Sequence, residues 1–138
     1  MSEGVGTWSP EGAVNVPSIE ALRAAAAAWI DEGEALIDRL PDTPMAALCS
    51  AMRLPEGAID DRIAALEDRE LDALARFFTL AEARHAAWEA GARSPVVALY
   101  AQLRARGVEV AELGRWIRAH TENRFLPRGS LQARLRGG

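Results

Sequence analysis

The chain has 138 residues, a formal net charge of −4 and a single cysteine, and 49% of its residues are hydrophobic. This length suits one domain with its own core, and one cysteine excludes an intramolecular disulfide. No apolar run approaches the roughly 20 residues that cross a bilayer and no secretory signal pattern opens the chain, so we expect a cytoplasmic protein without a membrane span.

Alanine and arginine dominate the composition. The chain contains 28 alanines, and all 16 of its basic residues are arginine. Alanine favours helix but adds little volume to a core, so the few aromatic side chains must do much of the packing. Arginine without lysine is typical of a GC-rich coding sequence, and we expect a bacterial protein. Charge is unevenly divided, because residues 1–112 have a balance of −9 and residues 113–138 a balance of +5.

The pattern of glycine, proline and charge divides the chain into three regions. Residues 1–17 contain three glycines and two prolines without helical periodicity, which predicts a non-helical, flexible arm. Trp8 in this arm is either an anchor to the rest of the molecule or an isolated side chain. Residues 18–121 are predicted to form the helical domain, and residues 122–138 a basic C-terminal segment.

The helical domain is predicted to begin with a long helix. Ser18 is a good N-cap, and apolar residues spaced three and four apart continue from there to Leu40. Gly33 costs about 1 kcal/mol relative to alanine within a helix, so it marks a candidate bend. Two short helices are predicted to follow, over residues 43–54 and 58–66.

The central helix is predicted over about residues 69–90. Its apolar positions are three and four apart: Leu71, Leu74, Phe78, Ala81, His85 and Trp88. This spacing is typical of a helix with a broad buried face. Asp68 is the predicted cap, and Gly91 is predicted to end the helix in the left-handed conformation that glycine adopts readily.

Two further helices are predicted before the C-terminal segment. Ser94 and Pro95 supply a cap and a first-turn proline for a helix that runs to Gly107, and another helix covers about residues 109–121. A short connection places the first of these beside the central helix. Since no alternating run indicates a strand, the predicted fold class is all-α, a compact bundle of five to six helices around the central one.

Residues 48–66 loosely resemble a helix-turn-helix. Their apolar positions roughly fit the spacing of that motif: Cys49, Met52, Leu54, Ile59 and Ile63. The second helix, however, would present mainly acidic side chains, namely Glu56, Asp60 and Asp61 beside Arg62, whereas affinity for phosphates needs positive charge. Two short helices that cross the bundle are the alternative interpretation.

Residues capable of catalysis or metal binding are scattered. Glu82 and His85 form one Glu-x-x-His pair, whereas carboxylate-bridged di-iron bundles need two such pairs and two further carboxylates; the other histidine, His120, has Ile117 three residues before it. Cys49 lies at an apolar helix position, where thiols are usually inert. The chain also lacks a phosphate-binding loop, a dinucleotide fingerprint and a CxxC motif. We therefore expect no metal, no cofactor and no enzymatic activity.

The C-terminal stretch combines arginine with aromatic and amide side chains. The candidate partner-binding residues are Arg115, Trp116, Arg118, His120, Asn123, Arg124, Phe125, Leu126 and Arg128. Arginine and aromatic groups bind acidic partners or single-stranded nucleic acid by charge and stacking. In the alternative interpretation the stretch folds back, with Phe125 and Leu126 sealing one end of the bundle.

The leading hypothesis is a non-catalytic interaction module, a small accessory or adaptor subunit that docks on a larger protein through its C-terminal segment. A nucleic-acid-binding regulator that uses residues 48–66 or the arginine-rich tail is the first alternative. A self-associating structural protein, such as a homodimer, is the second, because regular helical seams with alanine-rich faces can pair between chains.

Overall fold

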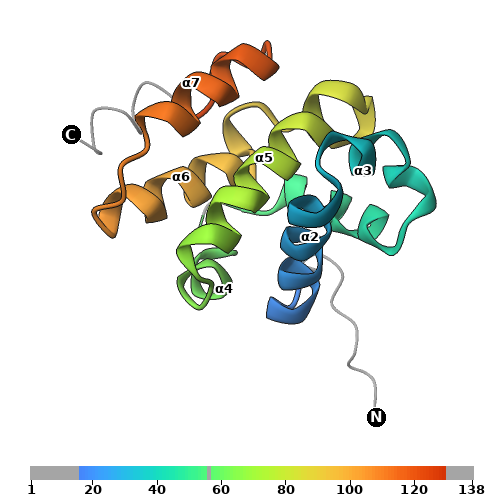
Figure 1. Ribbon diagram of the computed structural model, residues 1–138, viewed down its shortest axis with the longest axis horizontal. Helices are drawn as coiled ribbons and strands as arrows, with labels where there is room; N and C mark the ends of the chain where they lie inside the picture. Colours follow the sequence, from blue (N-terminus) through green and yellow to red (C-terminus); the bar gives the residue numbers. More distant parts are fainter. Residues whose placement is uncertain (1–15, 56, 130–138) are drawn as a thin grey trace.

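A computed structural model describes residues 16–55 and 57–129 of the chain. Over these ranges the protein is all-α, as predicted, and contains no strand. The α-helices, labelled as in Figure 1, are α2 Ile19–Glu32, α3 Glu34–Asp38, α4 Asp60–Ala64, α5 Asp68–Arg84, α6 Pro95–Ala105 and α7 Ala111–His120. Four 3-10 segments connect them, namely η1 Leu40–Asp42, η2 Pro44–Arg53, η3 Ala86–Trp88 and η4 Gly91–Arg93.

Helix α5 lies at the centre of the bundle, as its apolar spacing predicts. It packs against α2, α3, α6, α7 and η3 (Figure 1). Phe77 and Phe78 on α5 are fully buried, and their rings meet edge-on with centroids 5.1 Å apart. Aromatic pairs in this arrangement stabilise a core beyond their buried area, so these two side chains supply much of the volume that alanine does not.

Both ends of α5 differ from the sequence prediction. Glu67, not Asp68, is the N-cap, and it forms a reciprocal capping box with Glu70. The helix ends at Arg84 because His85 is extended, with φ −130° and ψ 113°, and its Nε2 lies 2.8 Å from the Ile37 carbonyl oxygen. Gly91 has a positive φ of 59°, but it belongs to η4 and does not end α5.

Trp88 explains why the apolar spacing continues beyond the end of α5. In η3 the chain turns, and the Trp88 ring packs on Phe77 and Phe78 at centroid distances of 5.9 and 6.2 Å. Trp88 is 4% exposed. Its burial was therefore predicted correctly, although it reaches the core from a turn and not from the helix itself.

The predicted first helix is divided in two. Ser18 caps α2 by accepting a hydrogen bond from the Ala21 amide at 3.0 Å, as expected. Gly33 then adopts φ +62°, a conformation that other residues resist, and α3 continues in a new direction. The next segment, η2, is a 3-10 helix where the sequence predicted a short α-helix.

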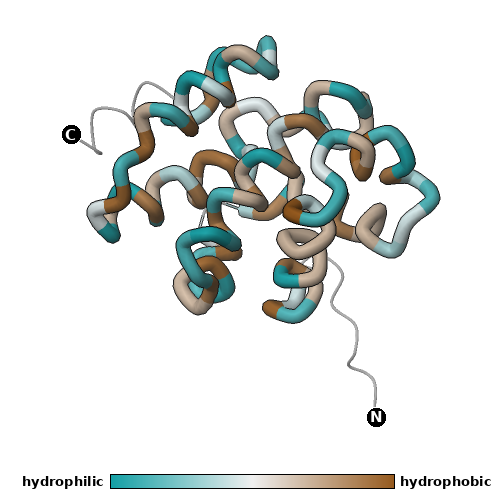
Figure 2. The backbone as a smooth tube through the Cα atoms, viewed as in Figure 1, coloured by the Kyte–Doolittle hydropathy of each residue, from teal (hydrophilic) through white to brown (hydrophobic). Residues whose placement is uncertain are grey.

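Helices α6 and α7 complete the described part of the bundle. Ser94 caps α6 by accepting from the Val96 amide, as predicted, and α7 buries Leu113 and Ile117. Figure 2 shows hydrophilic and hydrophobic residues alternating along α7, which is the pattern of a helix with one covered face. Gly114 allows a close approach here, because a Cβ at this position would lie 2.9 Å from the Tyr100 Oη.

The described chain holds no helix that is both long and apolar enough to cross a membrane. Val16 packs against the core and Pro17 is buried, so this described end of the predicted arm contacts the body. Trp8 and the last nine residues lie outside the described residues.

Candidate interaction surface

The nine predicted partner-binding residues lie on α7 and on the described residues that follow it. From here on, the term C-terminal segment means these described residues, 121–129. The environments of the nine residues differ. Five are exposed: Arg115, Arg118, Arg124, Phe125 and Arg128. Trp116, His120 and Asn123 are half-buried, and Leu126 is buried. We use the term C-terminal surface for the five exposed residues.

Trp116 makes its contacts within the molecule. Its ring meets Trp29 of α2 edge-on at 6.1 Å, and the Arg76 guanidinium lies 5.0 Å from its centroid. His120 stacks on the same ring at 4.1 Å, and its Nδ1 lies 2.7 Å from the Trp116 carbonyl oxygen. These contacts connect α7 to α2 and α5, so Trp116 and His120 contribute mainly to the position of α7.

Asn123 attaches the C-terminal segment to the body. Its Nδ2 donates to Glu82 Oε1 at 2.5 Å and to the Gly91 carbonyl oxygen at 3.0 Å, while its Oδ1 accepts from the Phe125 amide at 2.9 Å. Leu126 is 4% exposed. Over the described residues the segment therefore folds back on the bundle, although Phe125 does not seal it, because that ring is 42% exposed.

Glu82 is a buried residue next to this surface that the sequence interpretation did not connect with it. Its side chain is 6% exposed, and Oε2 has no hydrogen-bond partner among the described residues. Burial raises the pKa of this carboxyl, while Asn123, the Ser94 hydroxyl and the amides of Ala90 and Gly91 act in the opposite direction. The sequence carried a signal for this burial, because residue 82 lies four residues after Phe78, on the apolar face of the helix.

The basic side chains of the C-terminal surface lie on α7 and on the C-terminal segment. Arg115 and Arg118 of α7 form no ion pair within the described ranges. The guanidinium of the exposed Arg128 lies 5.8 Å from the centroid of the buried Tyr100 ring, which is a cation–π contact near the outer limit of distance. Positive charge and one exposed aromatic ring are thus available on this surface.

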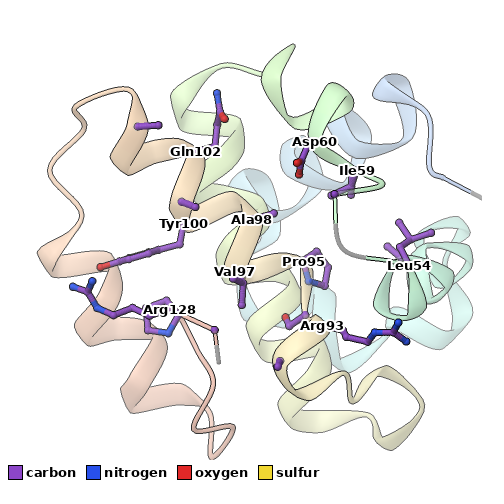
Figure 3. A pocket seen from close by; sticks show the side chains of 18 of the residues that line it. Leu54, Ile59, Asp60, Arg93, Pro95, Val97, Ala98, Tyr100, Gln102 and Arg128 are labelled. Atoms are coloured by element: carbon purple, nitrogen blue, oxygen red, sulfur yellow. The ribbon is translucent and has the colours of Figure 1, made fainter. Parts of the chain in front are cut away.

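A groove of about 850 Å³ lies next to the C-terminal segment (Figure 3). Tyr100 and Arg128 form one side, and Ile59 and Asp60 the other. Val97 of α6 also lines it. The groove is open and mostly apolar, with charge at its edges, and it adjoins the C-terminal surface at Arg128.

The structure does not support the helix-turn-helix interpretation of residues 48–66. The first element, η2, is a 3-10 segment, and the second, α4, has only five residues. Ile59 and Ile63 are buried, whereas Asp60 and Asp61 are exposed. Neither described element of this region is an α-helix long enough to serve as a recognition helix in a DNA groove, and the alternative interpretation describes the region better.

The residues considered for metal binding or catalysis do not converge. Glu82 bonds to Asn123, whereas His85 faces the Ile37 carbonyl oxygen. The Cys49 thiol donates to the Ala87 carbonyl oxygen, which also accepts from Arg53. Within residues 16–55 and 57–129, no group of three histidine, cysteine or acidic side chains is arranged to hold a metal ion.

The fold and the surface define a class, that of a small all-α protein with a basic C-terminal surface. Comparisons of the chain with protein families, with curated proteins and with solved structures found no match.

Proposed function

We propose that this chain is a non-catalytic interaction module, an accessory or adaptor subunit that binds an acidic surface on a larger protein through its C-terminal surface. The observation that carries this proposal is the exposed Phe125 ring, 42% accessible, on a segment whose neighbouring residues include exposed arginines. Arginine and aromatic side chains are enriched at protein interfaces and dominate their energetics.

The fixed backbone around Phe125 supports the proposal. Asn123 is held by Glu82 and Gly91, and its own Oδ1 accepts from the Phe125 amide. Leu126, the next residue, is buried. An exposed ring between anchored neighbours loses less conformational freedom on binding than a ring on a free tail, so this position suits a docking residue.

The charge division supports an acidic partner. Residues 113–138 have a balance of +5 while the rest of the chain is acidic, and opposite charge on a partner would steer association and orient it. The acids of the body are partly neutralised internally, for example by Arg84, which pairs with Glu34 and Asp38. The C-terminal surface is therefore the candidate for an external partner.

Point substitutions test the proposal better than deletion, because removing the segment would also remove buried Leu126 and the Asn123 anchor. Phe125→Ala and Arg118→Glu are the test variants. Ile30→Ala is the control for the aromatic change, since Ile30 is 53% exposed on α2, and Arg69→Glu is the control for the charge, since its side chain is 78% exposed on α5.

The measurement is quantitative mass spectrometry of proteins that co-purify with each tagged variant from its own host, followed by titration of the partner identified. We expect at least tenfold weaker binding for Phe125→Ala and Arg118→Glu, and unchanged binding for both controls. Equal loss in test and control variants would refute the assigned surface. Salt-dependent binding to single-stranded DNA would favour the nucleic-acid alternative, because phosphate contacts weaken steeply with salt.

A further inference from the structure

Glu82 is the one charged side chain that is buried within the described ranges. Oε1 accepts hydrogen bonds from Asn123 Nδ2 at 2.5 Å and, more weakly, from the Ala90 amide at 3.5 Å, while Oε2 has no partner there. A buried carboxylate is unfavourable unless it is paired or fully hydrogen-bonded. This carboxyl is therefore better suited to the neutral form than to the charged one.

Among the described residues, the groups that act on Glu82 are neutral: the Asn123 and Ser94 side chains and the amides of Ala90 and Gly91. Arg84, the last residue of α5, pairs with Glu34 and Asp38, and His85, which follows the helix, faces the Ile37 carbonyl oxygen. Arg106, the C-cap of α6, pairs with Asp68 at the far end of α5, and His120 of α7 stacks on Trp116. Cys49 and Arg53 of η2 bond to the Ala87 carbonyl oxygen. The titratable side chains on the adjoining loops are exposed to solvent: Glu89, Arg93, Glu122 and Arg124.

The C-terminal segment provides the polar cover of this carboxyl. Asn123 is its shortest hydrogen-bond partner, and Leu126 is buried three residues further on. Residues 121–129 form turns and irregular structure and no helix or strand, and segments of this kind open at lower free energy than a core. If Glu82 loses its proton, the easiest way for water to reach it is for this segment to detach.

We propose that Glu82 and Asn123 form a proton-dependent clasp. The buried, half-bonded site of Glu82 beneath residues 121–129 suits the neutral carboxyl, and ionisation favours release of the segment because hydration of both carboxylate oxygens in the open form outweighs the stronger hydrogen bond that Asn123 donates to the charged form. The clasp concerns how the segment is held, and it stands whether or not the C-terminal surface binds a partner. Its effect would be to control the placement of Phe125.

The direction of the pH effect follows from proton linkage. The pKa of Glu82 is raised in the folded state, so the closed form binds more protons than the open form. The stability of the closed form is then greatest below the ordinary pKa of glutamate, and it declines as pH rises to the raised pKa. The closed state weakens by up to about tenfold for each pH unit in that interval and levels off above it.

Hydrogen exchange of the full chain between pH 5 and pH 8, corrected for intrinsic rates, tests the clasp. The amides of Phe125, Leu126 and Gly129 are the reporters, since all three are bonded within the segment. In the wild type we expect their protection to fall with pH while protection of α5 and α6 changes less. Glu82→Gln should keep them protected at pH 8, and Glu122→Gln, an exposed carboxyl on the same segment, should behave like the wild type.

Asn123→Asp provides a second test. It places another carboxyl against Glu82 Oε1, and two adjacent carboxyls cannot both ionise easily. We expect at least tenfold lower protection of the segment at pH 8 than in the wild type, restored by acidification. The same pH slope in wild type and Glu82→Gln would overturn the clasp, as would wild-type protection of Asn123→Asp at pH 8. If Glu82→Gln fails to fold by circular dichroism, the Asn123→Asp result decides the question.

Discussion

Carboxyl groups have opposite environments at the two ends of α5. At the N-terminal end, three carboxylates form ion pairs with arginines. The distances are 2.9 Å from Asp68 Oδ1 to Arg106 Nη1, 3.4 Å from Glu70 Oε2 to Arg23 Nε and 2.7 Å from Asp72 Oδ1 to Arg76 Nε. At the C-terminal end, Glu82 is buried beside neutral amides and has one oxygen without a partner in the described chain. The environment of a carboxylate, more than its sequence, thus decides whether its ionisation supports or opposes the fold.

The helix dipole adds to this difference. Negative charge is stabilised near the N-terminus of a helix, where amide groups are unpaired, and destabilised near the C-terminus, where carbonyl groups are. Asp68 and Glu70 lie in the first turn of α5, whereas Glu82 lies in its last turn. Burial and the dipole therefore both favour the neutral form of Glu82.

The largest expected effect is that of Glu82→Lys. The substitution brings a cation to a buried position where Asn123 and Ala90 present hydrogen-bond donors. An uncompensated buried charge destabilises a protein by about 3–5 kcal/mol, and we expect the free energy of unfolding to fall by about that amount. Urea denaturation followed by circular dichroism measures it. Glu89→Lys, at an exposed position, should change stability by less than about 0.5 kcal/mol. Similar losses of unfolding free energy in the two variants would contradict the difference between the buried and the exposed carboxyl.

Leu126→Ala should have a smaller effect. Leu126 is 4% exposed, and truncation of a buried leucine to alanine destabilises by about 2–5 kcal/mol. We expect about 2–3 kcal/mol, at the low end of that range, because the surrounding segment can relax into the space. Phe125→Ala is the matched control and should lose less than about 1 kcal/mol, since the ring is largely exposed. Thermal or urea unfolding at pH 6 measures both, and an equal loss would show that the segment is not anchored through Leu126.

Asp68→Asn should have the smallest effect. The Asp68 side chain is 57% exposed although it lies 2.9 Å from Arg106, and exposed ion pairs contribute about 0–1 kcal/mol. We expect the free energy of unfolding to fall by less than about 1 kcal/mol. In 1 M salt, where charges are screened, the variant and the wild type should have nearly the same stability. Urea midpoints at two salt concentrations give the comparison. A loss as large as that of Glu82→Lys would mean that the exposed end of α5 depends on its ion pairs after all.

The described helices were predicted correctly where the local sequence signals are strong. Ser94 and Pro95 begin α6 as expected, because a side-chain cap and a fixed proline φ both act within a few residues. The predicted bend at Gly33 is confirmed, because the helix is interrupted there by a glycine with positive φ. This bend was predictable for the same reason, since it depends on the local backbone alone. The sequence likewise predicted the central position of α5, from the width of its apolar face.

Contacts between distant parts of the chain were beyond the sequence interpretation. The apolar spacing through His85 and Trp88 predicted a longer central helix, but His85 bonds to Ile37, 48 residues earlier. The sequence interpretation named Glu82 only as one half of a Glu-x-x-His pair that is insufficient for a metal site. Its hydrogen-bond partner Asn123 could not be predicted, since it lies 41 residues later. The exposed part of the candidate site, the arginines and Phe125, was predictable from composition, whereas its anchoring by Asn123 and Leu126 was not.

Tyr100 links two parts of the molecule that are separate in the sequence. Its hydroxyl occupies the space that the absent side chain of Gly114 leaves on α7, and its ring faces Arg128 and lines the groove. A methyl group at residue 114 would displace this ring. The shape of the groove wall therefore depends on the absence of a side chain at Gly114 of the neighbouring helix α7. The packing of α7 against α6 and the shape of the groove wall therefore depend on the same ring.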